Sequence, residues 1–315
     1  MRKSVFASLV LLLAHAPIQA EERLALSLKM SPQVAAEVVA SEVVEIAEPE
    51  QPEQPLVEPV AEPVAPEELA AAAAPLAVFQ MSGYLELGMM QHQLTQNYPN
   101  WNGQFVRGFL RTAVDTAWQL EILASSQFGD SGTLLVLGNT YDINENWYTT
   151  NSIASSRGGF FLSQLKLDSA INRIWLDGKN LVTSVALGVV QAKDEHRDLS
   201  VMLSGAYHFS EPWVLEGGIR FNQSNPGGVA STGKYAALTY GRDQESIVSL
   251  RYGFGTEAYQ TLGTNVQISN FASDVYTLTW RKWLRPKQGV QLRLEAYKNP
   301  NYSRNGVEVS VFQEF

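Results

Sequence analysis

The stretch that decides the fold is Arg304–Phe315, which reads RNGVEVSVFQEF. In a β-strand successive side chains point to opposite faces, so every second residue shares a face. One face of this stretch carries the apolar residues Val307, Val309, Val311 and Phe315. The other face carries Glu308, Ser310 and Glu314. The alternation predicts a strand with one apolar face and one polar face.

A strand of this kind that ends on an aromatic residue is similar to the closing strand of a bacterial outer-membrane barrel. The similarity implies that the barrel assembly machinery, a partner of such chains, reads an assembly signal made by Val307, Val309, Val311 and Phe315. Gln313 departs from the pattern, because an apolar or aromatic residue is usual at that position. Taken alone, the stretch also fits the last edge strand of a soluble β-protein.

The composition excludes several classes of protein. The 315 residues include no cysteine, so there is no disulfide, no thiolate metal site and no lipoprotein attachment cysteine. Mean hydropathy is −0.11, and beyond the amino terminus no apolar run approaches the roughly 20 residues of a membrane helix. A helical membrane protein is thereby excluded. A barrel is not, because its alternating strands average to neutral hydropathy.

The amino-terminal residues 1–20 have the pattern of a secretory signal peptide. Arg2 and Lys3 form its charged region, and an apolar core runs from Val5 to Ala14. Ala20 ends a plausible cleavage site. We therefore expect export across the inner membrane.

Residues 21–76 are dominated by Glu, Pro, Ala and Val. Their twelve Glu against Arg23 and Lys29 account for most of the formal net charge of −9. Frequent proline blocks helices and sheet ladders, and like charges repel one another. The segment is expected to be a disordered acidic Pro-rich periplasmic tether. One or two helical turns over Val34–Ile46, formed on contact with a partner, are the alternative. The rest of the chain is near neutral, so no nucleic-acid partner is expected.

Residues 77–315 consist of short alternating runs separated by turn residues, and they predict an all-β transmembrane antiparallel up-and-down barrel. About 14 strands fit, although 12 are possible if 104–127 divides differently. The candidate strands are 79–92, 104–113, 116–127, 132–141, 147–156, 160–175, 180–191, 198–208, 213–222, 233–241, 246–255, 271–283, 288–297 and 305–315. Tight connections alternate with longer ones at 93–103, 223–232, 256–270 and 298–304. Short periplasmic turns and longer outer loops are typical of bacterial barrels.

The tryptophans support the same architecture. Six of the seven lie beside the short turns, at one expected rim: Trp118, Trp147, Trp175, Trp213, Trp280 and Trp283. Only Trp101 falls in a longer loop. Aromatic residues form girdles at membrane interfaces because the ring is apolar while its N–H needs water.

Charged residues indicate which face of each strand looks inward. A lipid-facing Arg or Lys at mid-membrane costs roughly 2–4 kcal/mol. The expected lumen-lining residues are Glu86, Arg107, Arg111, Glu121, Lys166, Asp168, Glu216, Arg220, Arg251, Arg293, Glu295 and Glu308. Such mixed charges can line a narrow water-filled pore, or they can form an ion-pair network that rigidifies a closed barrel. Barrel size does not decide between them, because about 8 strands give a filled lumen and about 16 an open one.

The region from Tyr84 to Phe315 resembles the YaiO-like family of outer-membrane β-barrels. The resemblance rests on Asn146-Trp147 at the start of one strand, on Tyr252–Glu257 (YGFGTE) at the end of another, and on the terminal strand Gly306–Phe315. It implies an integral location in the cell outer membrane, in contact with its lipids. It also implies a surface or envelope role, in some members tied to exopolysaccharide export. It brings no catalytic residues.

Three functions remain open from the sequence. The first is a non-enzymatic narrow channel, or an accessory for surface polysaccharide, which outer residues such as Tyr98, Trp101 and Glu257 would contact. The second is a barrel enzyme acting on lipid, with His92 activating a serine such as Ser155 or Ser156. The third is a passive anchor whose tether binds a periplasmic partner. No metal site, nucleotide loop or cofactor motif is visible.

Overall fold

The computed structural model describes residues 80–315 except 195, 211 and 264–265. The expected signal peptide (1–20) and tether (21–76) lie outside the described residues. Fourteen strands are present: β1 (Ser82–Leu94), β2 (Trp101–Ala113), β3 (Thr116–Gln127), β4 (Asp130–Asp142), β5 (Trp147–Gly158), β6 (Leu165–Trp175), β7 (Leu181–Gln191), β8 (Arg197–His208), β9 (Trp213–Asn225), β10 (Val229–Arg242), β11 (Ser246–Gly263), β12 (Val266–Arg285), β13 (Gln288–Lys298) and β14 (Ser303–Glu314). No helix in this part of the chain combines the length and the hydropathy needed to cross a membrane.

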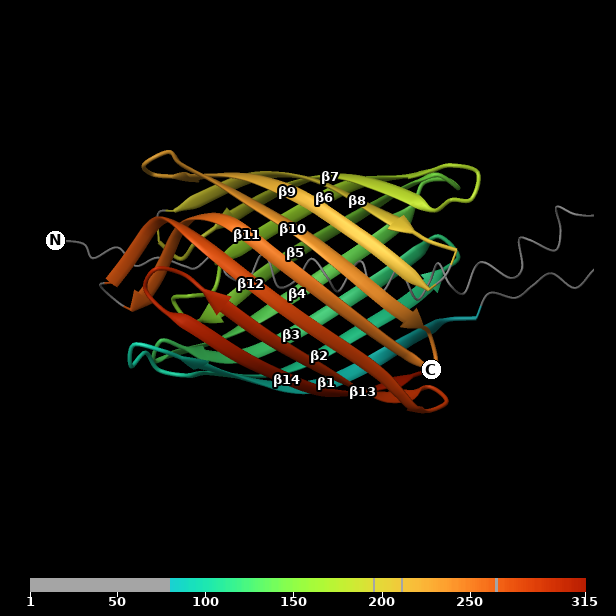
Figure 1. The fold of residues 1–315 in the computed structure, drawn as a ribbon, viewed down its shortest axis with the longest axis horizontal. Helices are drawn as coiled ribbons and strands as arrows, with labels where there is room; N and C mark the ends of the chain where they lie inside the picture. The colour runs from blue at the N-terminus through green and yellow to red at the C-terminus, as the bar shows by residue number, and fades with distance from the viewer. Residues whose placement is uncertain (1–79, 195, 211, 264–265) are drawn as a thin grey trace, which may run out of the picture. The chain divides into compact units, whose positions relative to one another are not determined.

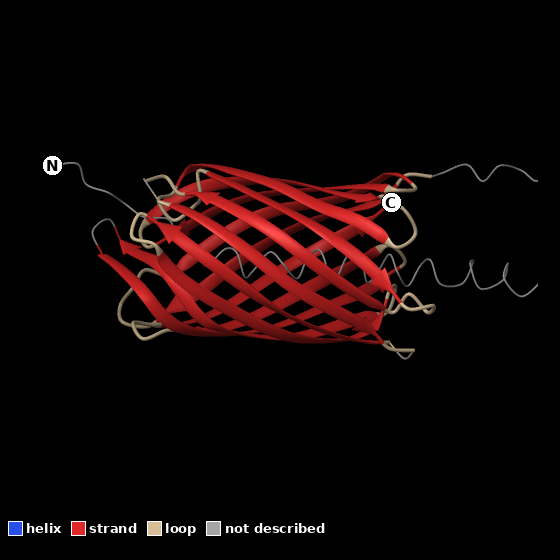
Figure 2. Ribbon diagram, turned by 90° about the horizontal axis from the view of Figure 1, so that it is seen from above, coloured by secondary structure: helices blue, strands red, loops and turns tan. Residues whose placement is uncertain are grey.

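The strands form one closed antiparallel barrel in sequence order (Figure 1), which confirms the expected fold class. All of them run obliquely to the barrel axis (Figure 2), as closure of a sheet requires. β14 closes the sheet against β1, with Met89 opposite Val309. Gly83 and Phe315 exchange backbone hydrogen bonds at 3.3 and 3.0 Å, so the pairing continues to the end of β14.

The alternation of side chains separates an apolar outer face from a mostly polar inner face. On β1, Leu85 and Leu87 are about half exposed, whereas Glu86 between them is 2 % exposed. β14 follows the same rule, with Val307, Val309, Val311 and Phe315 exposed on the outside and Glu308 and Ser310 buried inside. Exposed large apolar residues occur on every strand except β2, as a barrel surrounded by lipid requires.

The connections at the end away from the carboxyl terminus are shorter than expected. β11 and β12 have 18 and 20 residues and occupy most of the segment 256–270, which was expected to be a long loop. Their hairpin extends beyond its neighbours in Figure 1. β9 and β10 likewise leave only 226–228 between them, instead of the expected loop 223–232. Beyond the membrane neither face of a hairpin meets lipid, so these segments lack the regular apolar alternation that marks a spanning strand.

Two further expectations were wrong in detail. β6 begins at Leu165 and not at residue 160, because the chain turns inward over 160–164, where Phe161 and Leu162 are fully buried. Trp283 lies at the expected rim but points into the barrel and is 6 % exposed. It lies three residues after Trp280, which is 41 % exposed, and positions an odd number apart face opposite sides. The lipid-facing girdle therefore lacks Trp283.

Candidate functional site

The lumen is the candidate site, and its two sides differ in the size of their side chains. We call the inner face of β12, β13, β14, β1, β2 and β3 the crowded wall. It carries the large residues Trp101, Phe105, Arg107, Phe109, Arg281, Trp283, Arg293, Tyr297 and Phe312. We call the inner face of β6, β7, β8 and β9 the thin wall. Its two middle strands turn mostly small residues inward, namely Ser184, Ala186, Gly188, Ser200, Ser204 and Ala206, with Met202 as a larger residue between the two β8 serines.

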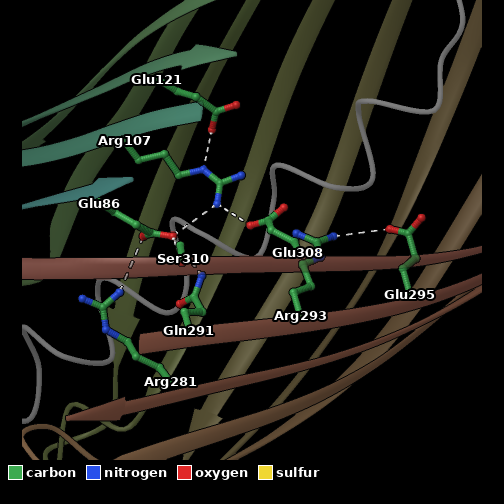
Figure 3. Close-up of polar contacts among 9 residues, drawn as sticks. All are labelled: Glu86, Arg107, Glu121, Arg281, Gln291, Arg293, Glu295, Glu308 and Ser310. Atoms are coloured by element: carbon green, nitrogen blue, oxygen red, sulfur yellow. Dashed lines mark hydrogen bonds and ion pairs between the residues drawn. The ribbon is translucent and has the colours of Figure 1, made fainter. Parts of the chain in front are cut away.

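Arg107 is the centre of an ion-pair network on the crowded wall (Figure 3). Its Nε donates to Glu121 Oε2 at 2.9 Å, and its Nη1 donates to Glu308 Oε1 at 2.6 Å. The same Nη1 lies 3.6 Å from Glu86 Oε1. The guanidinium also lies 3.8 Å from the centre of the Phe105 ring. One cation thus joins strands β1, β2, β3 and β14.

Glu86 extends this network towards β12 and β13. Its Oε1 accepts a hydrogen bond from Ser310 Oγ at 2.6 Å and one from Gln291 Nε2 at 3.4 Å. Its Oε2 lies 3.9 Å from Arg281 Nη1. The central carbon of the Arg281 guanidinium in turn lies 3.7 Å from the centre of the Phe312 ring. A carboxylate that is 2 % exposed is tolerated there because several donors and two cations surround it.

A second ionic group lies nearer the outer end of the crowded wall. Glu295 Oε1 accepts a hydrogen bond from Arg304 Nη2 at 2.5 Å. Glu295 Oε2 lies 3.6 Å from Arg293 Nη2, and Oε1 lies 3.8 Å from His92 Nδ1. The Arg304 guanidinium lies 4.1 Å from the centre of the Trp101 ring. Two guanidinium groups therefore share one carboxylate at this level.

Aromatic and amide side chains cover the outer end of the lumen on the same side. Trp101, Phe128, Leu262, Tyr297 and Tyr302 form one buried cluster. Gln260, which is fully buried, is hydrogen-bonded to both Tyr302 and Asn299. Tyr297 donates to Glu257 Oε1 at 2.8 Å. These contacts tie β11 to β13 and to the turn before β14.

The inward segment 160–164 continues this cover towards β5. Phe161 and Leu162 pack against Phe105, Leu123 and Leu134 on the inner face of β2, β3 and β4. The Phe160 amide donates to Asp130 Oδ2 at 2.8 Å. The Lys193 ammonium donates to the carbonyls of residues 158 and 159. The segment is therefore held from two neighbouring turns.

The thin wall carries fewer and more accessible charges. Lys166 Nζ lies 2.9 Å from Asp168 Oδ2, and Arg220 Nη2 lies 4.0 Å from Asp168 Oδ1. The Asp168 side chain is 24 % exposed, against 2 % for Glu86 on the crowded wall. A Cβ on Gly188 would lie 2.7 Å from Ser200 Oγ and 2.8 Å from Asp168 Oδ1, so this glycine allows the side chains of the two neighbouring strands to approach it closely.

The structure divides the twelve expected lumen-lining residues among four places. The crowded wall holds Glu86, Arg107, Glu121, Arg293, Glu295 and Glu308, and the thin wall holds Lys166, Asp168, Glu216 and Arg220. Arg251 lies on β11 with its guanidinium 3.6 Å from the centre of the Tyr235 ring. Arg111, near the end of β2, donates to the Val114 carbonyl at 2.9 Å.

Sequence reasoning missed Arg281, Arg304 and the inward orientation of Trp101. Arg281 is followed directly by Lys282, so charge alone did not assign a face to either residue. Arg304 and Trp101 were assigned to loops, yet they lie in β14 and β2 and are each 3 % exposed. Glu257 is likewise only 4 % exposed. Trp101, Arg304 and Glu257 therefore offer little surface for contact with a sugar outside the barrel.

The residues considered for serine chemistry are not brought together. Ser155 Oγ donates to the Gln164 carbonyl at 2.9 Å, and Ser156 Oγ donates to the Ser163 carbonyl at 2.6 Å. His92 instead lies beside Glu295 and over Gly306, where a Cβ would come 2.2 Å from His92 Nδ1. His92 is on β1 and the serines are on β5, which are not adjacent strands.

Comparison with known proteins assigns this architecture to a family. The profile described as YaiO membrane beta barrel domain matches residues 82–260. The match ends before β12, β13 and the terminal strand β14. No curated protein matches the sequence significantly.

Solved structures of other barrels are similar at low identity. The CymD monoaromatic hydrocarbon channel has 8 % identity and a TM-score of 0.49, covering 74 % of this chain and 87 % of that one. Outer-membrane expressed OmpT of Vibrio cholerae has 8 % identity and a TM-score of 0.44, covering 75 % and 97 %. The translocator domain of the autotransporter NalP from Neisseria meningitidis has 11 % identity and a TM-score of 0.41, covering 76 % and 89 %.

Proposed function

Since the chain belongs to the YaiO family of membrane β-barrels, we propose that it is a narrow, non-enzymatic channel for small polar solutes. It is an integral protein of the outer membrane, with the apolar outer faces of its fourteen strands in contact with lipid. The proposal concerns what the inside of the barrel does.

The observation that carries the proposal is the difference between the two walls of the lumen. Small side chains such as Ser184, Ala186 and Ser204 face the lumen from β7 and β8 and take up little of its width. The charges beside them on β6 and β9 include both signs and are the more accessible ones. A polar path with few bulky side chains favours passage of water and small solutes.

The crowded wall limits the width of that path. Its guanidinium and carboxylate groups are paired, and its aromatic rings are packed against them. The cover formed by segment 160–164 and by the cluster around Tyr302 narrows the outer end further. We therefore expect a conductance well below that of a general 16-stranded porin.

Bilayer recordings with a blocking variant test the channel. Ala186→Trp places an indole on the thin wall, and Ala236→Trp places the same group on the lipid face of β10. We expect small, stable conductance steps in planar bilayers and slow swelling of liposomes in small sugars. Ala186→Trp should lower both severalfold, and Ala236→Trp should leave both unchanged. Absence of conductance and of permeation in correctly folded protein would overturn the proposal.

The non-enzymatic part of the proposal is supported by the separation of His92 from Ser155 and Ser156. His92→Ala is the direct test, because this was the histidine considered for activating a serine. We expect the lipid A profile and the phospholipase activity of cells carrying His92→Ala to equal those of the wild type. A change in either profile would restore the hypothesis of a barrel enzyme.

The covered outer end favours a second candidate, a closed barrel that acts as an envelope accessory or anchor. In that case the buried network around Arg107 serves stability alone. The same recordings separate the two functions. A closed barrel conducts in neither the wild type nor the Ala186→Trp variant.

A further inference from the structure

A cavity of about 80 Å³ lies in the lumen just below the outer cover, beside the crowded wall. Its lining includes His92, Trp101, Arg107, Arg293, Glu295 and Arg304. A single water molecule needs about 10–15 Å³ of such space, so the cavity admits a solute of several atoms. Neither the channel proposal nor the ion-pair network accounts for this space.

Two of the lining side chains present hydrogen-bond donors that no protein group accepts. Within the described residues, Trp101 Nε1 and Arg304 Nε and Nη1 are buried without a partner. Both residues are 3 % exposed. A buried donor without an acceptor costs about 1–3 kcal/mol, and more when the group is charged. An acceptor inside the cavity would remove this cost.

The nearest carboxylates are already engaged by other groups. Glu295 Oε1 accepts from Arg304 Nη2, and Glu308 Oε1 accepts from Arg107 Nη1. Over the whole lining the three arginines Arg107, Arg293 and Arg304 balance the three glutamates Glu121, Glu295 and Glu308. Beside Arg304, however, Arg293 and Arg304 share Glu295 alone, so two cations face one anion at that end. A ligand that completes the site at that end brings oxygen acceptors for the unpartnered donors, and a negative charge suits the two guanidinium groups there.

The Arg304 guanidinium is held in place before any ligand binds. Its Nη2 donates to Glu295 Oε1 at 2.5 Å. Its central carbon lies 4.1 Å from the centre of the Trp101 ring and 4.8 Å from the centre of the Tyr297 ring. A donor that is already oriented loses little freedom on binding, which strengthens the interaction. Guanidinium and indole N–H groups around a cavity of this size match a carboxylate group.

We propose that this cavity binds one small monocarboxylate, of the size of formate or acetate, through Arg304 and Trp101. The inference concerns binding and does not depend on transport, because the site is complete on the crowded wall. It gives a role to the buried donor groups of Arg304 and Trp101, two residues that were expected to lie in loops.

Equilibrium dialysis of the detergent-solubilised full chain against radiolabelled acetate tests the site. We expect saturable binding of about one acetate per chain. Arg304→Lys keeps the charge but removes the guanidinium N–H groups, and it should weaken binding about tenfold or more. Trp101→Phe keeps an aromatic ring but removes the indole N–H, and it should weaken binding severalfold.

Matched variants outside the lumen serve as controls. Arg173 covers the Trp175 ring at 3.5 Å, so Arg173→Lys repeats the same change at a stacked arginine far from the cavity. Trp118→Phe repeats the other change at an exposed tryptophan. Both should bind acetate as the wild type does. Heat-modifiable gel mobility must show that every variant is folded.

Two results would overturn the proposal. The first is the absence of saturable acetate binding by the folded wild type. The second is equal affinity in the wild type and in Trp101→Phe, which decides the matter even if Arg304→Lys does not fold. Bilayer conductance does not enter either result, so failure of the channel proposal leaves this test unaffected.

Discussion

Arg107 shows how a single residue determines the packing of the lumen. It lies within 3.6 Å of carboxylates from three different strands, Glu86, Glu121 and Glu308. Without Arg107, these three carboxylates would remain buried close to one another with their negative charges uncompensated. The aromatic ring of Phe105 below the guanidinium closes the arrangement. The network therefore depends on one cation more than on any one anion.

Replacing Arg107 with methionine should destabilise the barrel strongly. The three carboxylates would remain buried without their shared partner, and breaking a buried ion pair from one side costs about 3–5 kcal/mol. Urea unfolding in lipid vesicles measures the free energy of unfolding. Arg197→Met, at an exposed position on β8, should change it little. Equal stability of the two variants would show that the network contributes nothing, and adding Glu121→Gln to Arg107→Met should recover part of the loss.

At the scale of the strands, the alternation of side chains predicts the segments that cross the membrane and little of the structure beyond them. All fourteen strands are confirmed, because an apolar face and a polar face are required wherever one side meets lipid and the other does not. The outer halves of β11 and β12 and the inward segment 160–164 were missed, since neither lies against lipid. The prediction of lumen-lining residues was limited in a similar way, because it relied on charge alone. Arg107 and Glu121 were assigned from charge, whereas Arg281, next to Lys282, was not.

The inward segment is expected to control the outer end of the lumen. Phe161 is completely buried against the inner face of β2, β3 and β4. Phe161→Ala should lower the free energy of unfolding by about 3–5 kcal/mol, because it leaves a cavity in a packed cluster. It should also raise single-channel conductance, since the cover over the outer end is weakened.

Phe209→Ala is the control for this change. Phe209 is 48 % exposed and lies in the turn between β8 and β9, at the end where the chain terminates. It should alter neither stability nor conductance appreciably. If Phe161→Ala leaves the conductance at the wild-type value, the segment does not restrict the passage.

At the scale of the whole molecule, closure of β14 against β1 makes the barrel. Met89 and Val309 are paired across this seam and both point outward. Paired Cα atoms in an antiparallel sheet lie about 4.5–5.5 Å apart, within the range of a disulfide. The double variant Met89→Cys/Val309→Cys should therefore form a disulfide on oxidation, visible as a mobility change on a non-reducing gel.

The absence of native cysteine makes this experiment specific. Leu85→Cys/Val307→Cys is the matched pair at the same seam. Leu85 is opposite Gln313, six residues from Val307, which is about 20 Å along the strand. This pair should not form a disulfide. Efficient linkage of the control pair, and not of the first, would mean a different register.

The most direct test of the account is whether water reaches the thin wall and not the crowded wall. Single cysteines at Ser204 (thin wall), Ser310 (crowded wall, 3 % exposed) and Leu203 (lipid face, 44 % exposed) can be labelled with a small membrane-impermeant thiol reagent in intact membranes. The account predicts fast labelling of Ser204→Cys, slow labelling of Ser310→Cys and none of Leu203→Cys. Equal labelling at Ser204→Cys and Ser310→Cys, or no labelling at Ser204→Cys, would contradict it.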